Sequence, residues 1–200
     1  MDAACDQTTL YALAWALTDG VGPITFGRLL SEFGSPDAAL GAPASRLARI
    51  RGISDARAEA IARGREASLE AARAELAVCR ENNVRVISRF DADFPPGLRQ
   101  IPDAPIVLYV RGELLPGDAV ALAVVGSRRC SIYGSEQARR FGELLAGAGF
   151  TVVSGLARGI DAFAHHGAID AGGRCIAVVG CGLDHIYPPE NLALAERILK

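Results

Sequence analysis

Two short glycine-containing segments carry arginine side chains in a pattern suited to anion binding. They read GSRR at residues 126–129 and SGLARGID at residues 154–161. Glycine lets a ligand approach the backbone closely, and arginine presents a planar fork of donors that matches phosphate oxygens. Backbone amides in a loop that opens into a helix add a positive field at the same place. A tight turn with a solvated arginine is the alternative for either segment alone, but two such segments in one chain favour anion binding.

Apolar runs before these segments predict the strands that position them. Residues 119–125 (AVALAVV) are typical of a strand buried on both faces, and residues 151–153 (TVV) and 175–180 (CIAVVG) predict two more strands. Helical patterns lie between them, the first beginning near Gly134 or Ser135 and the second near Ile160. This alternation predicts an α/β fold with a Rossmann-like parallel sheet and right-handed connections.

Ligands of an open parallel sheet bind beyond the carboxyl ends of its strands. Arg128 and Arg158 both follow predicted strands, so they should converge on one pocket if those strands are neighbours. The first turn lacks the GxGxxG pattern of dinucleotide-binding proteins, which argues against a nicotinamide or flavin cofactor. We therefore predict no cofactor.

Composition excludes several functional classes. The formal net charge is −2, so any binding of nucleic acid must depend on local placement of charge. The apolar runs are much shorter than the ~20 residues that span a bilayer, and the first residues do not resemble a secretory signal. The five cysteines include no CxxC pair, which favours a reduced, cytoplasmic protein with no metal site.

Three strings give the chain a resemblance to a known family. They are FDADFPPGLRQIPDAPIVLYVRGEL, AVVGSRRCSIYG and GFTVVSGLARGIDAFAHHGAIDAGGRCIAVVGCGLDHIYPPEN, and they span most of residues 90–200. In this order they resemble the DNA-processing protein A family (DprA), also called Smf. The resemblance implies a single-stranded DNA-binding protein of natural transformation that helps to load the RecA recombinase onto incoming strands. It also implies no membrane association, and a homodimer in the full-length protein.

The resemblance implies two domains. Residues 1–80 would form a small helical domain similar to SAM or helix-hairpin-helix modules, and residues 81–200 an extended Rossmann-like DNA-binding domain. Members of the family continue with more strands, so the second domain is expected to be incomplete at its C-terminus. Strands predicted at residues 84–88 and 106–110 are expected to extend the main sheet.

Helical patterns in the first domain have recognisable boundaries. Thr8 or Thr9 is expected to cap a first helix, and Ser54 or Asp55 a long one that ends near Cys79. The GVGP turn at residues 20–23 resembles half of a helix-hairpin-helix module. A plain interhelical turn is the preferred interpretation, and contact with DNA there stays open.

The predicted DNA- and phosphate-binding residues lie in or beside the loops of the parallel sheet. They are Gly126, Ser127, Arg128, Ser154, Gly155, Arg158, Gly159 and Arg174. Arg128 matches an arginine that the family uses to hold DNA phosphates, and Arg174 stands where the family has a lysine in a GG-K-T string. We expect these two and Arg158 at one edge of the sheet. Asp161 and His165 are expected to support the site, although capping of its helix explains Asp161 at least as well.

No catalytic constellation is evident, so the chain is predicted to be a binding protein and not an enzyme. The alternative is a Rossmann-like enzyme of the phosphoribohydrolase type. The phosphate-binding GGGxGxMxE string of those enzymes is absent, and Asp161 and Glu190 are the available acids near the loops. A module that senses mononucleotides is a third interpretation. Tyr133 and Tyr187 are candidates for stacking on bases.

Overall fold

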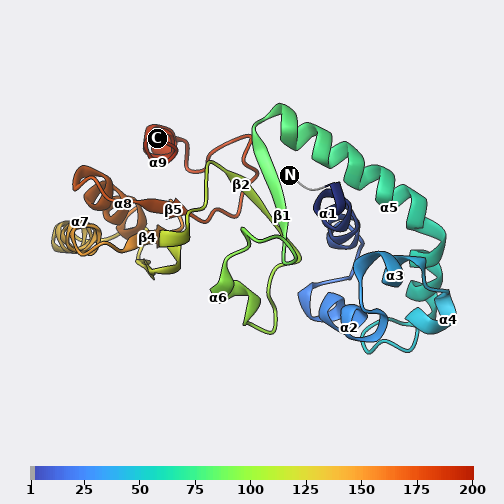
Figure 1. The fold of residues 1–200 in the computed structure, drawn as a ribbon. Helices are drawn as coiled ribbons and strands as arrows, with labels where there is room; N and C mark the ends of the chain where they lie inside the picture. Colours follow the sequence, from blue (N-terminus) through green and yellow to red (C-terminus); the bar gives the residue numbers. More distant parts are fainter. Residues whose placement is uncertain (1–2) are drawn as a thin grey trace. The chain divides into compact units, whose positions relative to one another are not determined.

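The computed structural model describes residues 3–200, with side chains described from residue 7 onward (Figure 1). The chain forms two compact units, Met1–Arg111 and Gly112–Lys200. The sequence predicts a domain boundary near residue 80, and that boundary stays a prediction.

Helices form most of the first unit. Their bounds are α1 (Ala3–Ala16), α2 (Pro23–Phe33), α3 (Pro36–Gly41), α4 (Ala44–Leu47) and α5 (Asp55–Glu81). Ser54 caps α5 as predicted, because its Oγ accepts a hydrogen bond from the Arg57 amide at 3.4 Å. The predicted cap of the first helix is wrong, because α1 already begins at Ala3. Thr9 lies inside that helix, and its buried hydroxyl instead donates to Asp91 at 2.7 Å.

A two-stranded hairpin belongs to this helical unit. Strands β1 (Val84–Ser88) and β2 (Val107–Arg111) pair in antiparallel register from Val84↔Arg111 to Ser88↔Val107, and the short helix α6 (Pro96–Arg99) lies between them in sequence. The expectation that these strands extend the main sheet is wrong, since they pair with each other and pack against α1 and α5. The hairpin completes an apolar core, in which Ile106 joins Trp15, Phe26 and Leu47.

The second unit contains the predicted parallel sheet. Its strands are β3 (Ala121–Ala123), β4 (Thr151–Ser154) and β5 (Cys175–Ala177), in the order β3-β4-β5. The helices are α7 (Ile132–Gly147), α8 (Ile160–Asp170) and α9 (Leu192–Ile198), with 3-10 turns η1 (Pro116–Ala119) and η2 (Pro189–Asn191). The α/β, Rossmann-like class predicted from the sequence is confirmed. Helix α7 begins two residues before the earliest predicted start, because Ser131 caps it by accepting the Gly134 amide at 3.1 Å.

Strand β3 is less buried than its apolar sequence predicts. Leu122 is 44% exposed, and Val125, just after the strand, is 70% exposed. Within residues 3–200, β3 is an edge strand whose partner is β4 alone. The prediction of burial on both faces is wrong, because burial requires helices packed over both faces of the sheet, and among the described residues β3 makes its close contacts with β4 alone.

Helices α7 and α8 lie side by side and approach each other closely (Figure 1). A Cβ atom placed on Gly142 would lie 2.2 Å from the Ala164 carbonyl oxygen, which is too close for any side chain. Ala164 and Ala168 on α8 in turn pack against Val152 of β4 and Cys175 of β5. Small residues on the two helices therefore permit the contact that supports the sheet.

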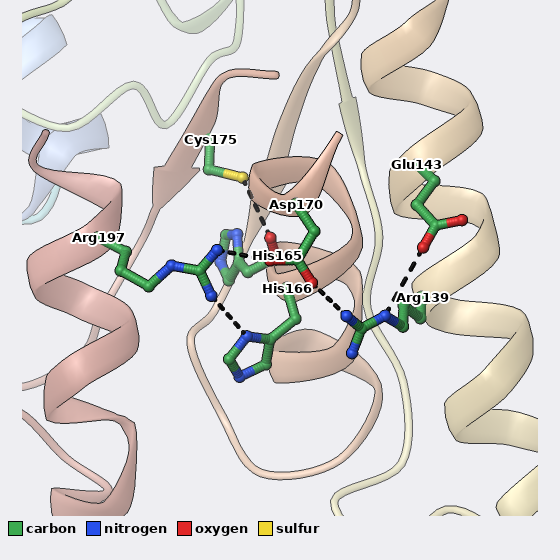
Figure 2. A network of polar contacts seen from close by, with 7 residues as sticks. All are labelled: Arg139, Glu143, His165, His166, Asp170, Cys175 and Arg197. Carbon is green, nitrogen blue, oxygen red and sulfur yellow. Dashed lines mark hydrogen bonds and ion pairs between the residues drawn. The ribbon is translucent and has the colours of Figure 1, made fainter. Parts of the chain in front are cut away.

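A charged network joins α7, α8 and α9 (Figure 2). Arg139 and Arg197 both form ion pairs with Asp170, the latter at 2.5 Å between Nη2 and Oδ1. The hydrogen bond from Arg197 is the main reason that the pKa of Asp170 is lowered. Arg197 also contacts His166, with 3.3 Å between Nη1 and Nδ1. The network holds the C-terminal ends of α8 and α9 together.

Candidate functional site

A pocket of about 370 Å³ opens at the carboxyl ends of the three parallel strands. Arg128 follows β3 and Arg158 follows β4, and both line this pocket. The other lining residues are Gly155, Ala157, Val179, Gly180, Cys181, His185, Tyr187 and Pro188. The sequence predicts that the two arginines converge if their strands are neighbours. Strands β3 and β4 are neighbours, so the loops that follow them lie at the same edge of the sheet.

Asp161 ties the two arginine-bearing loops to each other. Its Oδ1 accepts the Gly126 amide at 3.3 Å, and its Oδ2 accepts the Gly155 amide at 3.1 Å. The side chain is buried, with 6% of the residue exposed. Gly126 and Gly155 were expected to offer amides to a phosphate, but those amides already have an acceptor. Asp161 therefore positions the loops that carry Arg128 and Arg158.

The two arginine-bearing loops approach each other most closely at Gly159. Its φ is +76°, and an added Cβ would lie 2.2 Å from the Ser127 carbonyl oxygen. That oxygen accepts the Ile160 amide at 3.2 Å. The two serines act locally as well: the Ser127 hydroxyl accepts the Arg129 amide at 3.1 Å, and buried Ser154 donates to the Val124 carbonyl at 2.5 Å.

The two arginines of the pocket are in different electrostatic states. Arg128 is exposed, and no ion pair involves it within the part of the chain that the structure describes. Arg158 forms two hydrogen bonds with Glu190, one between Nε and Oε1 and one of 3.1 Å between Nη2 and Oε2. The Arg158 guanidinium also lies 5.7 Å from the centre of the Tyr187 ring. The hydrogen bond with Glu190 is the largest cause of the raised pKa of Arg158.

Arg174 does not join the pocket. It directly precedes β5, so it lies at the amino ends of the strands, whereas residues that follow parallel strands lie at the opposite edge. There it binds Asp118 through bonds of 2.5 and 2.9 Å, and it also donates to the Glu113 carbonyl. Burial raises the pKa of Asp118, but hydrogen bonds from Arg174, the Leu115 amide and Thr151 outweigh it, and the net pKa is lowered. The expectation of three arginines at one sheet edge is therefore wrong.

His165 is buried beneath the loop layer and does not line the pocket. Among the described residues, neither of its ring nitrogens has a hydrogen-bond partner of regular geometry. Burial lowers its pKa to about 4, against the opposing influence of Asp161. His165 is therefore a neutral core residue at neutral pH. Among the side chains from residue 7 onward, no group of three or more His, Cys, Asp and Glu residues could hold a metal ion.

The loop after β5 contributes Tyr187, a candidate for stacking on bases, and three further lining residues that the sequence did not indicate. Cys181, His185 and Pro188 all line the pocket from this loop. Their position follows from the same rule that placed Arg128 and Arg158, since β5 is parallel to β4 and ends at the same edge. The ion pair between Arg158 and Glu190 could not be predicted from a local sequence pattern, because 32 residues separate the two side chains.

Comparison with known proteins assigns the chain to a family. The sequence model described as DNA recombination-mediator protein A matches residues 85–200. The chain belongs to this family. A second model, described as a DprA-like N-terminal HHH domain, matches residues 6–77. The family resemblance inferred from the sequence is thus confirmed.

Curated relatives come from diverse bacteria. Protein Smf of Synechocystis sp. is 38% identical over 192 residues, which are 94% of this chain and 48% of that protein. Protein Smf of Escherichia coli is 47% identical over 111 residues, 55% of this chain and 30% of that protein. DNA processing protein DprA of Bacillus subtilis is 36% identical over 126 residues, 62% and 42% respectively. The chain thus spans about half or less of the length of these relatives.

Two solved structures resemble this member of the family. The X-ray structure of DNA processing protein A from Streptococcus pneumoniae has a TM-score of 0.73 and 29% identity, and covers 96% of this chain and 64% of that one. A structure of DNA processing protein A from Helicobacter pylori has a TM-score of 0.51 and 27% identity, and covers 58% and 52%. The latter is described as giving insight into a unique single-stranded DNA binding mode.

These comparisons do not favour the phosphoribohydrolase alternative, since the relatives are DNA-processing proteins. The two acids considered for catalysis are also engaged, Asp161 with two amides and Glu190 with Arg158. As for membranes, none of the helices described in residues 3–200 is long and apolar enough to cross one.

Proposed function

We propose that this chain binds single-stranded DNA through the pocket at the carboxyl ends of β3 and β4, in DNA processing during natural transformation. The observation that carries the proposal is the pair of arginines at one pocket, of which Arg128 is exposed and without an ion pair among the described residues. A guanidinium in that state is available to a phosphate. Family membership and the DNA-binding relative from Helicobacter pylori support the same conclusion.

The residues that line the pocket are suited to an unpaired strand. Loops surround it, and two arginines recognise phosphates without reading base edges. Tyr187 is 57% exposed at the pocket wall, and an aromatic ring can stack on any base. Binding should therefore depend little on sequence.

The wider role follows from the family. We propose that the full-length protein binds DNA without catalysing a reaction on it, and that it loads the RecA recombinase onto incoming strands. We also propose that it forms a homodimer and acts in the cytoplasm. The description of the matching family as a recombination mediator supports the role in recombination.

Fluorescence anisotropy with matched single-stranded and duplex oligonucleotides, across a salt series, tests the binding proposal. We expect tighter binding of the single strand with little sequence dependence. The salt slope should be shallow, about −0.7 for each phosphate contact. Equal affinity for duplex and single strand at moderate salt would contradict the proposal. Competition by mononucleotides as strong as that by oligonucleotides would favour a mononucleotide sensor.

Replacement of Arg128 by alanine locates the site. Arg128→Ala should weaken binding to all single-stranded sequences alike and make the salt slope shallower by about 0.7, one contact. Arg129→Ala is the matched control, because Arg129 is exposed in the same loop but does not line the pocket. If a folded Arg128→Ala protein keeps both affinity and salt slope, the site lies elsewhere.

A further inference from the structure

Glu190 presents its carboxylate to Arg158 as an anionic ligand would. Its two oxygens accept from Nε and Nη2 of the guanidinium, the bidentate arrangement in which arginine also binds a phosphate. The same hydrogen bond from Arg158 lowers the pKa of Glu190, so the carboxylate is charged at neutral pH. The Nε–Nη2 edge of one pocket arginine is thus already occupied by a carboxylate of the same chain.

The neighbouring residue anchors this carboxylate. Asn191 is buried, and its Nδ2 donates to the Leu156 carbonyl at 2.8 Å and to the Ala157 carbonyl at 3.3 Å. Both carbonyls belong to the loop that carries Arg158. Turn η2 is therefore fastened to that loop, and Glu190 stays beside the guanidinium at a high effective concentration. This distinguishes the pair from two long side chains that meet by chance at the surface.

We propose that Glu190 occupies the place of a DNA phosphate on Arg158 and so sets the affinity of the pocket for single-stranded DNA. The inference rests on the DNA-binding function proposed above. A phosphate can bind the Nε–Nη2 edge of Arg158 only in the fraction of molecules whose Glu190 has moved away, and the apparent affinity at that edge is reduced by that fraction. Arg128 carries no such carboxylate among the described residues, so a strand can bind there first.

The proposal has a consequence for the salt dependence. When a phosphate displaces Glu190, the strand releases a counterion, but the freed carboxylate attracts one. The second effect partly offsets the first at this contact, because an isolated carboxylate holds counterions less strongly than DNA does. Without the carboxylate, the contact of Arg158 with the phosphate should contribute its full slope of about −0.7.

Glu190→Gln tests the proposal, because glutamine keeps the size of the side chain and removes its charge. We expect single-stranded DNA to bind about two- to five-fold more tightly, the range that measured exposed ion pairs suggest. The salt slope should steepen by up to about 0.7. Glu143→Gln is the matched control: Glu143 has similar side-chain exposure, 48% against 50%, and pairs with Arg139 on α7, away from the pocket lining. It should change neither quantity.

A double-mutant cycle separates displacement from general repulsion of DNA by a nearby carboxylate. In an Arg158→Gln background, Glu190→Gln should give no gain in affinity. An equal gain in both backgrounds would overturn the proposal, and so would weaker binding by a folded Glu190→Gln protein, because Glu190 would then orient Arg158 for the ligand. If wild-type protein binds single strands but Glu190→Gln leaves affinity and slope unchanged, this inference alone fails. If the wild type does not bind, the proposed function fails and the inference with it.

Discussion

Arg128 and Arg158 show how the surroundings decide the chemistry of identical side chains. Both follow parallel strands and line one pocket, yet only Arg158 is paired, with Glu190. Arg174 has the same charge but meets Asp118 at the other end of the strands. Its bond to that carboxylate connects η1 to the start of β5.

His165 should make the stability of the protein depend on pH. Burial lowers its pKa to about 4, while an unfolded histidine titrates near 6.5. Between these values the unfolded chain binds more protons, so the free energy of unfolding falls as the pH drops from about 6.5 to about 4. The slope from this group alone is at most about 1.4 kcal/mol per pH unit. Above pH 6.5 its contribution is fully present.

Urea denaturation at several pH values measures this effect. His165→Leu removes this titrating group and should reduce the slope of the stability profile between pH 4 and 6.5; the part that remains includes His166, whose pKa is also lowered by burial. A His165→Leu protein with the wild-type profile would show that another group is responsible.

At the scale of elements, the contact between α7 and α8 should tolerate no added side chain. Gly142→Ala places a Cβ 2.2 Å from the Ala164 carbonyl oxygen, so the helices must separate. We expect a loss of about 1–3 kcal/mol in the free energy of unfolding, typical of overpacking. Thermal or urea unfolding followed by circular dichroism measures it.

Gly147→Ala is the matched control for this prediction. Gly147 ends the same helix, and an added Cβ would meet no atom within 4 Å. This change should raise stability by about 0.5 kcal/mol, since alanine favours the helix. Equal effects of the two substitutions would mean that helix propensity, and not close packing, governs α7.

At the scale of the whole molecule, the chain forms two compact units that meet after Arg111, 31 residues beyond the domain boundary that the sequence predicts near residue 80. The hairpin β1–β2 shares the apolar core of the helical unit, to which it contributes Ile106, Val86 and Val107. We expect residues 1–111 alone to unfold cooperatively and at higher urea concentration than residues 1–80. Removing the hairpin would expose the core face that it covers. A fragment of residues 1–80 as stable as 1–111 would support a boundary near residue 80.

The sequence alone was enough for the α/β class, the helical first unit, the strand positions and the two arginine loops. Each depends on local periodicity, on capping residues such as Ser54, or on glycines near the strand ends. The rule that loops after parallel strands lie at one edge of the sheet then predicts that Arg128 and Arg158 converge on one pocket if their strands are neighbours.

Only the tertiary structure decided which groups stay available to a ligand. The Asp161 carboxylate accepts hydrogen bonds from the amides of Gly126 and Gly155. Glu190 forms an ion pair with Arg158, and Asp118 forms one with Arg174. Local sequence can predict that a charged or polar group lies at a sheet edge. It does not specify the partner of that group, because the pairs of Arg158 and Arg174 join residues 32 and 56 positions apart, and hydrogen bonds over such separations form only when the chain has folded.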